Sequence, residues 1–255
     1  MAFGKETIEK QLEKSAELAK ITTQEIKANI YALNLYPLGV FAGREKGIPH
    51  PRKSKNKRPI LLVHGIVHNP SAFFKIKRKM DEDAWQNIFT VNYATRHGSL
   101  YRMLDPLAKR VEQILEETRA KQIDIIAHSL GGIIARLYAT GIGRGNVKNL
   151  ITLGTPHQGT KLSLFLKGVY PGTLSSDLRS GSYFLKDLSE RKLPTNTKLT
   201  SIYTPHDILI WPKGNCRATG LPKKSISNVE MDHVGHMGLL YDDLVLETIM
   251  KQIQK

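Results

Sequence analysis

Cysteine is almost absent from this sequence: of 255 residues, only Cys216 carries a thiol. A single cysteine excludes an intramolecular disulfide and therefore a small disulfide-stabilised fold. The first residues, MAFGKETIEKQ, also lack the basic, then apolar, then small-residue order of a signal peptide. We therefore expect a reducing, cytoplasmic location. No base can be paired with Cys216 from residue order, so we expect it to be a bystander.

Long apolar runs are missing as well. The longest candidate, Ile30 to Phe41, is interrupted by Asn34 and Pro37, and it falls short of the roughly 20 residues needed to span a bilayer. We expect no segment to cross a membrane alone. Because 40% of the residues are apolar and 24% are charged, the composition favours a folded globular chain over disorder.

Negative charge is scarce: 38 Lys and Arg residues face 23 Asp and Glu residues, and the net charge is +15. Such a field attracts nucleic acid or anionic lipid, or keeps a protein soluble. The basic residues are scattered without stacking aromatics, except in the run 52–58, which is typical of a solvated linker. We expect no nucleic acid partner. An anionic membrane surface remains a candidate partner, with peripheral association.

The first 58 residues differ from the rest. Residues 6–33 place apolar side chains at helical spacing, which predicts an N-terminal helical arm of one or two amphipathic helices. Packing of this arm on the main body is favoured over a membrane-surface anchor. Residues 47–58 are polar and basic and contain Pro49 and Pro51, a linker signature. We interpret 1–58 as arm and linker, and 59–255 as the main domain.

From Pro59 onward, short apolar runs alternate with helical patterns, as in parallel strands buried on both faces. This alternation predicts an α/β fold, with a doubly wound, mostly parallel sheet of about six strands and helices on both faces. We expect strands at 60–64, 88–93, 123–127, 149–153, 199–203 and 225–229, and helices at 104–115, 130–140 and 240–253.

One interval interrupts this alternation. Residues 158–197 show no strand pattern, and their apolar residues are concentrated near the beginning. A long insertion of this kind is either a lid or an extended surface loop. We expect a lid-like insertion.

The most informative segment is IDIIAHSLGGIIA, residues 123–135, which reads as an apolar strand, a tight turn and a helix. A nucleophile elbow needs this order, because small flanking residues let strand and helix approach while the serine is held at a strained turn. Ala127 stands where the first glycine of a GxSxG pattern is usual. The alternative is an ordinary turn with Ser129 as a helix cap, but the order of elements favours a nucleophile.

A second segment, ILLVHGIVH from residue 60 to 68, is a buried strand that ends in His64-Gly65. Acyl transfer develops an oxyanion that needs preorganised donors. The backbone N–H groups after Gly65 and after the candidate nucleophile are suitable, and they belong to Ile66 and Leu130. A glycine after a strand is by itself weak evidence, since it usually marks only a turn.

Taken together, six segments resemble the α/β-hydrolase superfamily, particularly small bacterial lipases and esterases. They are LLVHGIVHNPSAF, IIAHSLGGIIARLYA, LITLGTPHQGT, SGSYFLKDL, SIYTPHDILIWP and VGHMGLL. They follow the family's order between residues 60 and 253, and the first 58 residues lie outside the resemblance.

The family's order of nucleophile, acid and base implies roles for two further residues. An acid should follow the late strand 199–203, and Asp207 matches; Asp177, Asp187 and Asp232 are less well placed. A base should precede the last helix, and the resemblance selects His236, with His233 as the alternative. The predicted catalytic triad is therefore Ser129, Asp207 and His236. His128, beside the nucleophile, is expected to shape the site.

This triad implies a serine hydrolase that cleaves carboxylic esters, with an apolar acyl or lipid substrate suggested by the apolar insertion. No cofactor is expected, and no metal, because no cluster has ligand spacing. Two alternatives stay open. An acyltransferase would use the same triad with water excluded, and a membrane-surface binding module could be built on a hydrolase scaffold without catalysis.

Overall fold

A six-stranded parallel sheet forms the centre of the computed structural model, which describes residues 2–41, 45–49, 54–170, 172–220 and 222–254. Its strands are β1 (Ile60–Val63), β2 (Ile88–Val91), β3 (Ile123–His128), β4 (Val147–Leu153), β5 (Lys198–Tyr203) and β6 (Ile226–Glu230). Their order is β2-β1-β3-β4-β5-β6, with all five pairings parallel. The predicted doubly wound sheet is confirmed. Strands β1, β2 and β3 are buried throughout, whereas the edge strand β6 is partly exposed.

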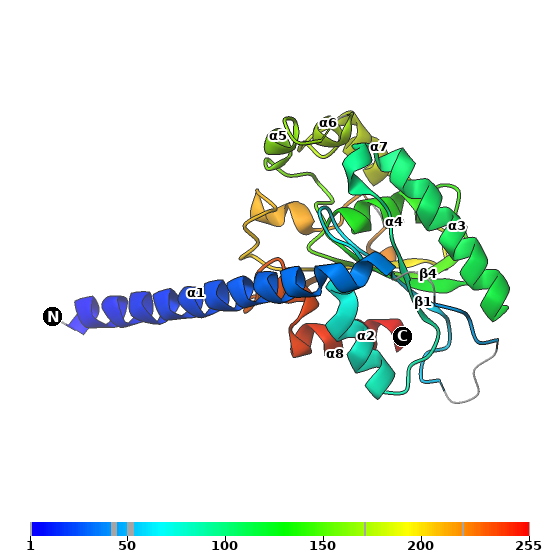
Figure 1. Cartoon of the computed structure of the whole chain (residues 1–255). Coiled ribbons are helices and arrows are strands. Elements are labelled where there is room, and N and C mark those ends of the chain that lie inside the picture. The colour runs from blue at the N-terminus through cyan, green and yellow to red at the C-terminus, as the bar shows by residue number, and fades with distance from the viewer. Residues whose placement is uncertain (1, 42–44, 50–53, 171, 221, 255) are drawn as a thin grey trace.

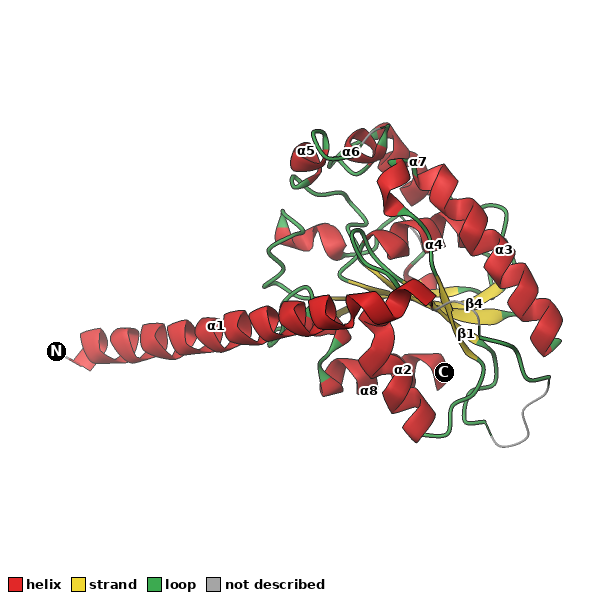
Figure 2. Cartoon of the chain, viewed as in Figure 1, coloured by secondary structure: helices red, strands yellow, loops and turns green. Residues whose placement is uncertain are grey.

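Helices cover both faces of the sheet (Figures 1 and 2). One face packs against α3 (Leu100–Thr118), α4 (Leu130–Thr140) and α7 (Tyr183–Glu190). The opposite face packs against α2 (Phe74–Glu82), α8 (Asp243–Gln254) and part of α1 (Ala2–Leu35). Two apolar cores result, because alternate strand residues such as Leu61 and Leu62 point to opposite faces.

The N-terminal arm is one continuous helix, α1. Residues 9–20 are exposed throughout, and burial begins at Ile21. Figure 1 shows the first half of α1 projecting from the body, while the second half lies against it. Within the described residues, no helix combines the length and apolar character that crossing a bilayer requires.

The remaining helices are short. The interval 158–197 holds α5 (Ser163–Leu166), α6 (Leu174–Asp177) and α7 and contains no strand among its described residues. Figure 1 shows α5 and α6 together at one end of the molecule. The 3₁₀ helices are η1 (Tyr36–Phe41), η2 (Pro70–Phe73), η3 (Thr95–His97), η4 (Lys213–Cys216), η5 (Lys223–Ser225) and η6 (Gly238–Leu240).

The basic run 52–58 differs in part from the expected solvated linker. Arg58 is not free in solvent, because its Nε donates to the buried carboxylate of Asp124 at 3.0 Å. A buried carboxylate needs such a partner, so the prediction was wrong for Arg58. Residues 50–53 lie outside the described residues.

Candidate active site

Ser129 occupies the turn between β3 and α4, with φ 53° and ψ −125°. A non-glycine residue with positive φ is strained, and such strain persists only where the surroundings hold it. Here the Ser129 N–H donates to the Leu153 carbonyl at 2.8 Å. Its own carbonyl accepts the Thr155 hydroxyl at 2.9 Å. The turn thus has the backbone conformation and support that the predicted nucleophile elbow requires.

Glycines around this turn allow the close approach. A Cβ on Gly131 would stand 2.4 Å from the His64 carbonyl oxygen, and one on Gly132 would stand 2.0 Å from Thr155 Oγ1. A Cβ on Gly65 would stand 2.9 Å from the Cβ of Ser129. The loop after β1 therefore lies directly against the serine, at the carboxyl ends of β1 and β3, where the strand order reverses. Open α/β sheets bind their ligands in this crevice.

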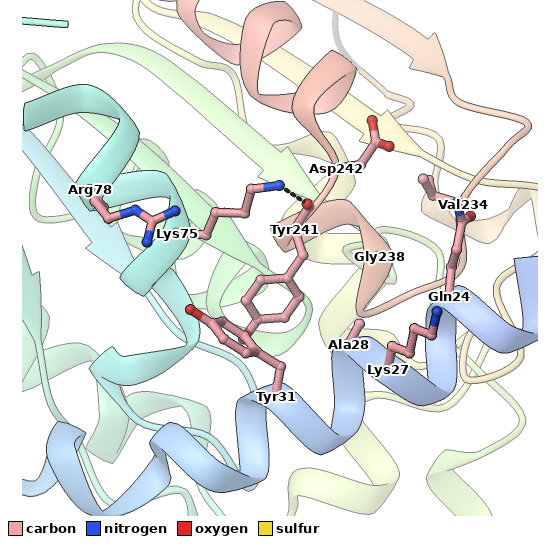
Figure 3. A pocket seen from close by; sticks show the side chains of 10 residues that line it. All are labelled: Gln24, Lys27, Ala28, Tyr31, Lys75, Arg78, Val234, Gly238, Tyr241 and Asp242. Atoms are coloured by element: carbon pink, nitrogen blue, oxygen red, sulfur yellow. Dashed lines mark hydrogen bonds between the residues drawn. The ribbon is translucent and has the colours of Figure 1, made fainter. Parts of the chain in front are cut away.

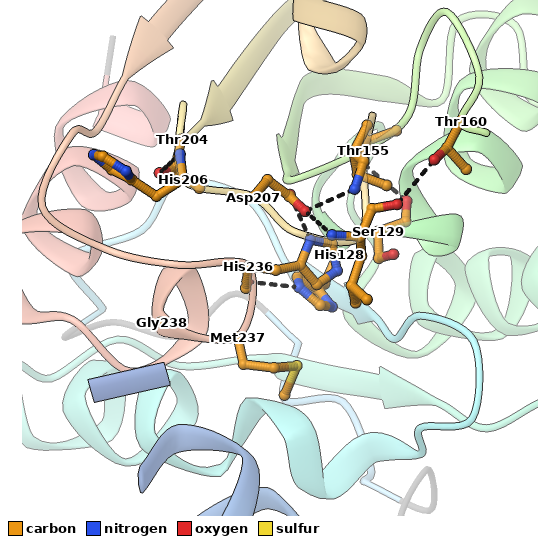
Figure 4. A network of polar contacts seen from close by, with 12 residues as sticks. His128, Ser129, Thr155, Thr160, Thr204, His206, Asp207, His236, Met237 and Gly238 are labelled. Carbon is orange, nitrogen blue, oxygen red and sulfur yellow. Dashed lines mark hydrogen bonds and ion pairs between the residues drawn. The ribbon is translucent and has the colours of Figure 1, made fainter. Parts of the chain in front are cut away.

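Asp207 and His236 form a buried pair (Figure 4). The imidazole Nδ1 donates to Asp207 Oδ2 at 2.6 Å. The other carboxylate oxygen accepts the N–H groups of Leu209 and Ile210, each at 2.8 Å. Because Nδ1 carries this proton, Nε2 of the neutral ring is left as a proton acceptor.

The electrostatics of the pair favour a basic imidazole. Burial lowers the pKa of His236, but the charge of Asp207, its hydrogen bond and the charge of Glu25 raise it, and the net pKa lies above the ordinary value. His128 packs beside the ring, with centroids 4.7 Å apart, and its Nε2 donates to the His236 carbonyl at 3.3 Å. His128 itself has a strongly lowered pKa because it is buried, so it is a neutral neighbour at physiological pH.

Ser129 and His236 adjoin the same corner of β4. Ser129 is bonded to Leu153, and a Cβ on Gly154 would stand 3.0 Å from His236 Nδ1. The three residues that the sequence predicted are therefore gathered in one place (Figure 4). Within this described group of three, Asp207 and His236 are directly hydrogen-bonded, and no hydrogen bond joins the Ser129 hydroxyl to the imidazole.

The predicted oxyanion donors are Leu130, which directly follows Ser129, and Ile66, which follows the Gly65 that lies against Ser129. Leu130 begins α4, where the first N–H groups have no partner within the helix. The peptide before Ile66 is oriented by His64, whose Nδ1 donates to the Gly65 carbonyl at 2.9 Å. His64 stacks on Tyr93, whose hydroxyl donates to the His64 carbonyl. Burial lowers the pKa of His64 to about 4, so the neutral ring keeps this arrangement.

The alternative residues lie in other contacts. His233 Nε2 is 3.1 Å from Asp242 Oδ1, and Asp232 is its second, looser partner at 3.7 Å. Asp187 pairs with Arg191 at 2.6 Å, and Asp177 accepts the hydroxyl of Thr173. None of these four residues is hydrogen-bonded to or ion-paired with Asp207 or His236.

Two residues that support the site have roles the sequence did not specify. Thr155, which sequence reasoning missed, supports the Ser129 carbonyl. His64 was expected to be a local hydrogen-bonding or pocket-lining group rather than a catalyst, and it fixes the Gly65 peptide. Both stand inside segments that carry the resemblance, but a threonine after a strand and a histidine before a glycine have many ordinary structural roles. Their partners become apparent only in three dimensions.

Cys216 is fully buried beside Tyr203 and Ile210, and burial raises the pKa of its thiol. A neutral buried thiol is a poor nucleophile. Within the described part of the chain, no group of three or more His, Cys, Asp or Glu side chains is arranged to hold a metal ion.

Comparisons with known proteins point to one superfamily. Triacylglycerol lipase of Vibrio cholerae is 26% identical over 163 residues, which cover 60% of this chain and 50% of the lipase. Lysosomal thioesterase PPT2-B of Xenopus laevis is 24% identical over 143 residues, covering 53% and 50%. The chain thus spans about half the length of these curated relatives.

Solved structures share the fold. The mature form of Bacillus licheniformis lipase BlEst2 superposes with a TM-score of 0.63 at 18% identity, covering 84% of this chain and 97% of the lipase. The α/β-hydrolase fold and the resemblance to lipases and esterases are thereby confirmed. The family model for palmitoyl protein thioesterase matches residues 59–206, more than half of the chain and including the serine elbow. The chain therefore belongs to the palmitoyl protein thioesterase family.

Proposed function

We propose that the protein is a serine hydrolase that cleaves carboxylic esters of apolar acyl groups. One observation carries the proposal: a buried Asp207–His236 pair beside a serine at a positive-φ strand-to-helix turn. A nucleophile, a base and a group that orients the base define covalent acyl transfer on many unrelated folds.

The chemistry follows from the contacts. His236 Nε2 takes the proton of the Ser129 hydroxyl, and the oxygen attacks the ester carbonyl. N–H groups of Ile66 and Leu130 hold the oxyanion. Asp207 orients the imidazole and stabilises its charged form. The imidazolium returns the proton to the leaving group, and water then releases the acyl group by the same steps. Catalytic hydrogen bonds often tighten only once substrate is bound and reacting. The Ser129–His236 hydrogen bond forms at that stage.

Exposed apolar side chains next to the proposed acid and in the insertion support an apolar substrate. Ile208, next to the proposed acid, is 77% exposed, and Phe165 of α5 is 76% exposed. The beginning of the insertion is tied to the segment after Asp207, because Lys161 N–H donates to the Trp211 carbonyl and its ammonium lies 3.6 Å from the Trp211 ring centroid. We therefore propose that residues 158–197 form a lid over an acyl-binding crevice.

A thioester is the second candidate substrate. It is favoured by the palmitoyl protein thioesterase family match and by the relative named a lysosomal thioesterase. The same nucleophile and oxyanion donors serve both reactions, because both substrates present an acyl carbonyl. A panel of oxygen esters and matched thioesters of graded acyl length would separate the two, and a rate that rises with acyl length is expected in either series.

Active-site labelling tests the proposal directly. A fluorophosphonate should label the wild-type protein covalently and leave Ser129→Ala unlabelled, because the probe reacts with an activated serine hydroxyl. Ser15→Ala, on the exposed half of α1, is the matched control and should label like the wild type. Equal labelling of Ser129→Ala would remove Ser129 from its role, and no labelling of the wild type would favour a non-catalytic binding module.

The acyltransferase alternative has its own readout. If water is excluded from the acyl-enzyme, adding a primary alcohol to the ester assay should divert most product into the new ester. We expect free acid to remain the main product, measured by chromatography of both products.

A further inference from the structure

Among residues 9–35 of α1, for which burial is described, Glu25 is the one charged residue on the buried face, which otherwise carries Ile21, Ala28 and Ala32. The residue is 9% exposed. Burying a carboxylate is costly unless hydrogen bonds compensate it, so its partners indicate what the residue does.

The hydrogen-bond partners of Glu25 directly follow His236 in the chain, and Gly235, which precedes it, lies against the carboxylate. The Met237 N–H donates to Glu25 Oε1 at 2.7 Å, and the Gly238 N–H donates to Oε2 at 2.9 Å. A Cβ on Gly235 would stand 2.4 Å from Oε2. Residues 235–238 therefore wrap around the carboxylate, with His236 inside the wrapped segment.

We propose that Glu25 is a positioning residue of the active site, which holds the backbone of His236 from α1 while Asp207 holds its ring. The proposal rests on the proposed function. With both the backbone and Nδ1 fixed, the direction of Nε2 toward Ser129 is fixed as well. Misplacement of a catalytic group by about 1 Å costs up to about 100-fold in rate, so a support of this kind acts on turnover.

Charge adds to the geometry. Burial lowers the pKa of His236, whereas Asp207 and then Glu25 raise it. The other titratable groups that face the ring are His128 and His68, and both have lowered pKa values because of burial. Asp207 and Glu25 are thus the two carboxylates that act on this imidazole.

A second contact of α1, with a residue that follows this segment, supplies a control. The rings of Tyr31 and Tyr241 meet edge to face, with centroids 5.2 Å apart. Beside them lies a cavity of about 560 Å³, lined by Gln24, Ala28, Tyr31, Val234, Gly238 and Tyr241 among others (Figure 3). The tyrosine contact fastens α1 without touching residues 235–237, so it separates helix attachment from histidine positioning.

The experiment compares Glu25→Gln with two variants of α1. Glu17→Gln makes the same chemical change on the exposed half, and Tyr31→Leu weakens the attachment. We expect Glu25→Gln to lower kcat by about tenfold, with KM nearly unchanged, and to move the acidic limb of the pH profile to lower pH. Glu17→Gln should match the wild type in kcat and in its pH profile. Tyr31→Leu should lower the melting temperature and leave the acidic limb of the pH profile at the same pH.

A Glu25→Gln variant with unchanged kcat and an unchanged acidic limb would overturn the proposal.

A second variant guards against loss of folding in Glu25→Gln. Gly235→Ala places a methyl group against the carboxylate from the other side. Gly235→Ala should lower kcat as Glu25→Gln does when Glu25 is present. In a Glu25→Ala background it should lower kcat little further. Equal additional losses in both backgrounds would contradict the contact.

Imidazole titration by NMR reads the same contact without catalysis. The pKa of His236 should be lower in Glu25→Gln than in the wild type, and an identical pKa in both would overturn the proposal. If the wild type fails to react with a fluorophosphonate while this difference persists, the proposed function falls and the Glu25 contact stands.

Discussion

At the scale of single residues, burial sets the chemistry of the histidines. His64, His128 and His157 have lowered pKa values because they are buried, whereas His236 has a raised one because carboxylates outweigh its burial. One residue type thus supplies both neutral supports and the proposed base, and the difference lies in the partner that each ring contacts.

These histidines predict sensitivity to acid. As the pH falls below the ordinary pKa of 6.5, His64 becomes protonated in the unfolded chain. In the folded protein the same ring stays neutral until about pH 4, because burial lowers its pKa. Stability that His64 contributes above pH 6.5 is therefore lost as the pH falls toward 4, by about 1.5 kcal/mol between pH 6.5 and 5. Urea unfolding of His64→Phe should show a shallower loss of stability over this range than the wild type.

The control for this effect is a substitution without a titrating group. Ile76→Val, in the core, should lower the free energy of unfolding equally at both pH values. If His64→Phe loses as much stability between pH 6.5 and 5 as the wild type, the folded ring is already protonated there.

At the scale of elements, the sequence predicted the sheet well, because buried parallel strands read as apolar runs. All six strands were placed, and helix 130–140 was predicted with the bounds it has. The predicted ends of strands and helices were less accurate. The strand predicted at 88–93 ends at Val91, and the helix predicted from 240 begins at Asp243, because the Asp242 carboxylate accepts the N–H groups of Leu244 and Val245. Side-chain caps of this kind are hard to distinguish from ordinary turns.

The site was predictable where its residues stand in local motifs, as with the strand, turn and helix around Ser129. Asp207 and His236 required the family's order, since a lone aspartate or histidine has many roles. Glu25 was not predictable, because its partners Met237 and Gly238 lie more than 200 residues away in the sequence. In the sequence it is one of several glutamates on a long helix.

The elbow itself yields a prediction. Gly131→Ala should destabilise the protein by about 1–3 kcal/mol, because the new methyl group meets the backbone carbonyl of His64 and the helix must shift. Urea unfolding measures the loss, and fluorophosphonate labelling should slow in parallel. Gly168→Ala, with open space around it, is the matched control. A Gly131→Ala variant as stable as the wild type would show that the loop after β1 yields easily.

At the scale of the whole molecule, the net charge of +15 combines with exposed apolar side chains of α1, η1 and the insertion, including Leu33, Leu38 and Phe165. Opposite charge concentrates a protein at a surface, and apolar side chains strengthen the contact once it is there. This combination supports the proposed peripheral association with anionic lipid.

Vesicle sedimentation checks that association. The protein should pellet with phosphatidylserine-containing vesicles at low salt, should not pellet with neutral phosphatidylcholine vesicles, and should be released by 1 M salt, where the Debye length falls to about 3 Å. Phe165→Ser, which leaves the charge unchanged, should weaken the pelleting. Absence of binding to anionic vesicles at low salt would contradict the proposal.

The exposed half of α1 has a practical consequence. With a rise of about 1.5 Å per residue, a tag attached near Leu12 stands about 20 Å along the helix from Glu25. Twelve consecutive positions, 9–20, are exposed. Immobilisation on a solid support through residues 9–20 would leave the crevice above β1 and β3 open. A dye attached to the same residues would report binding to a surface without perturbing Ser129.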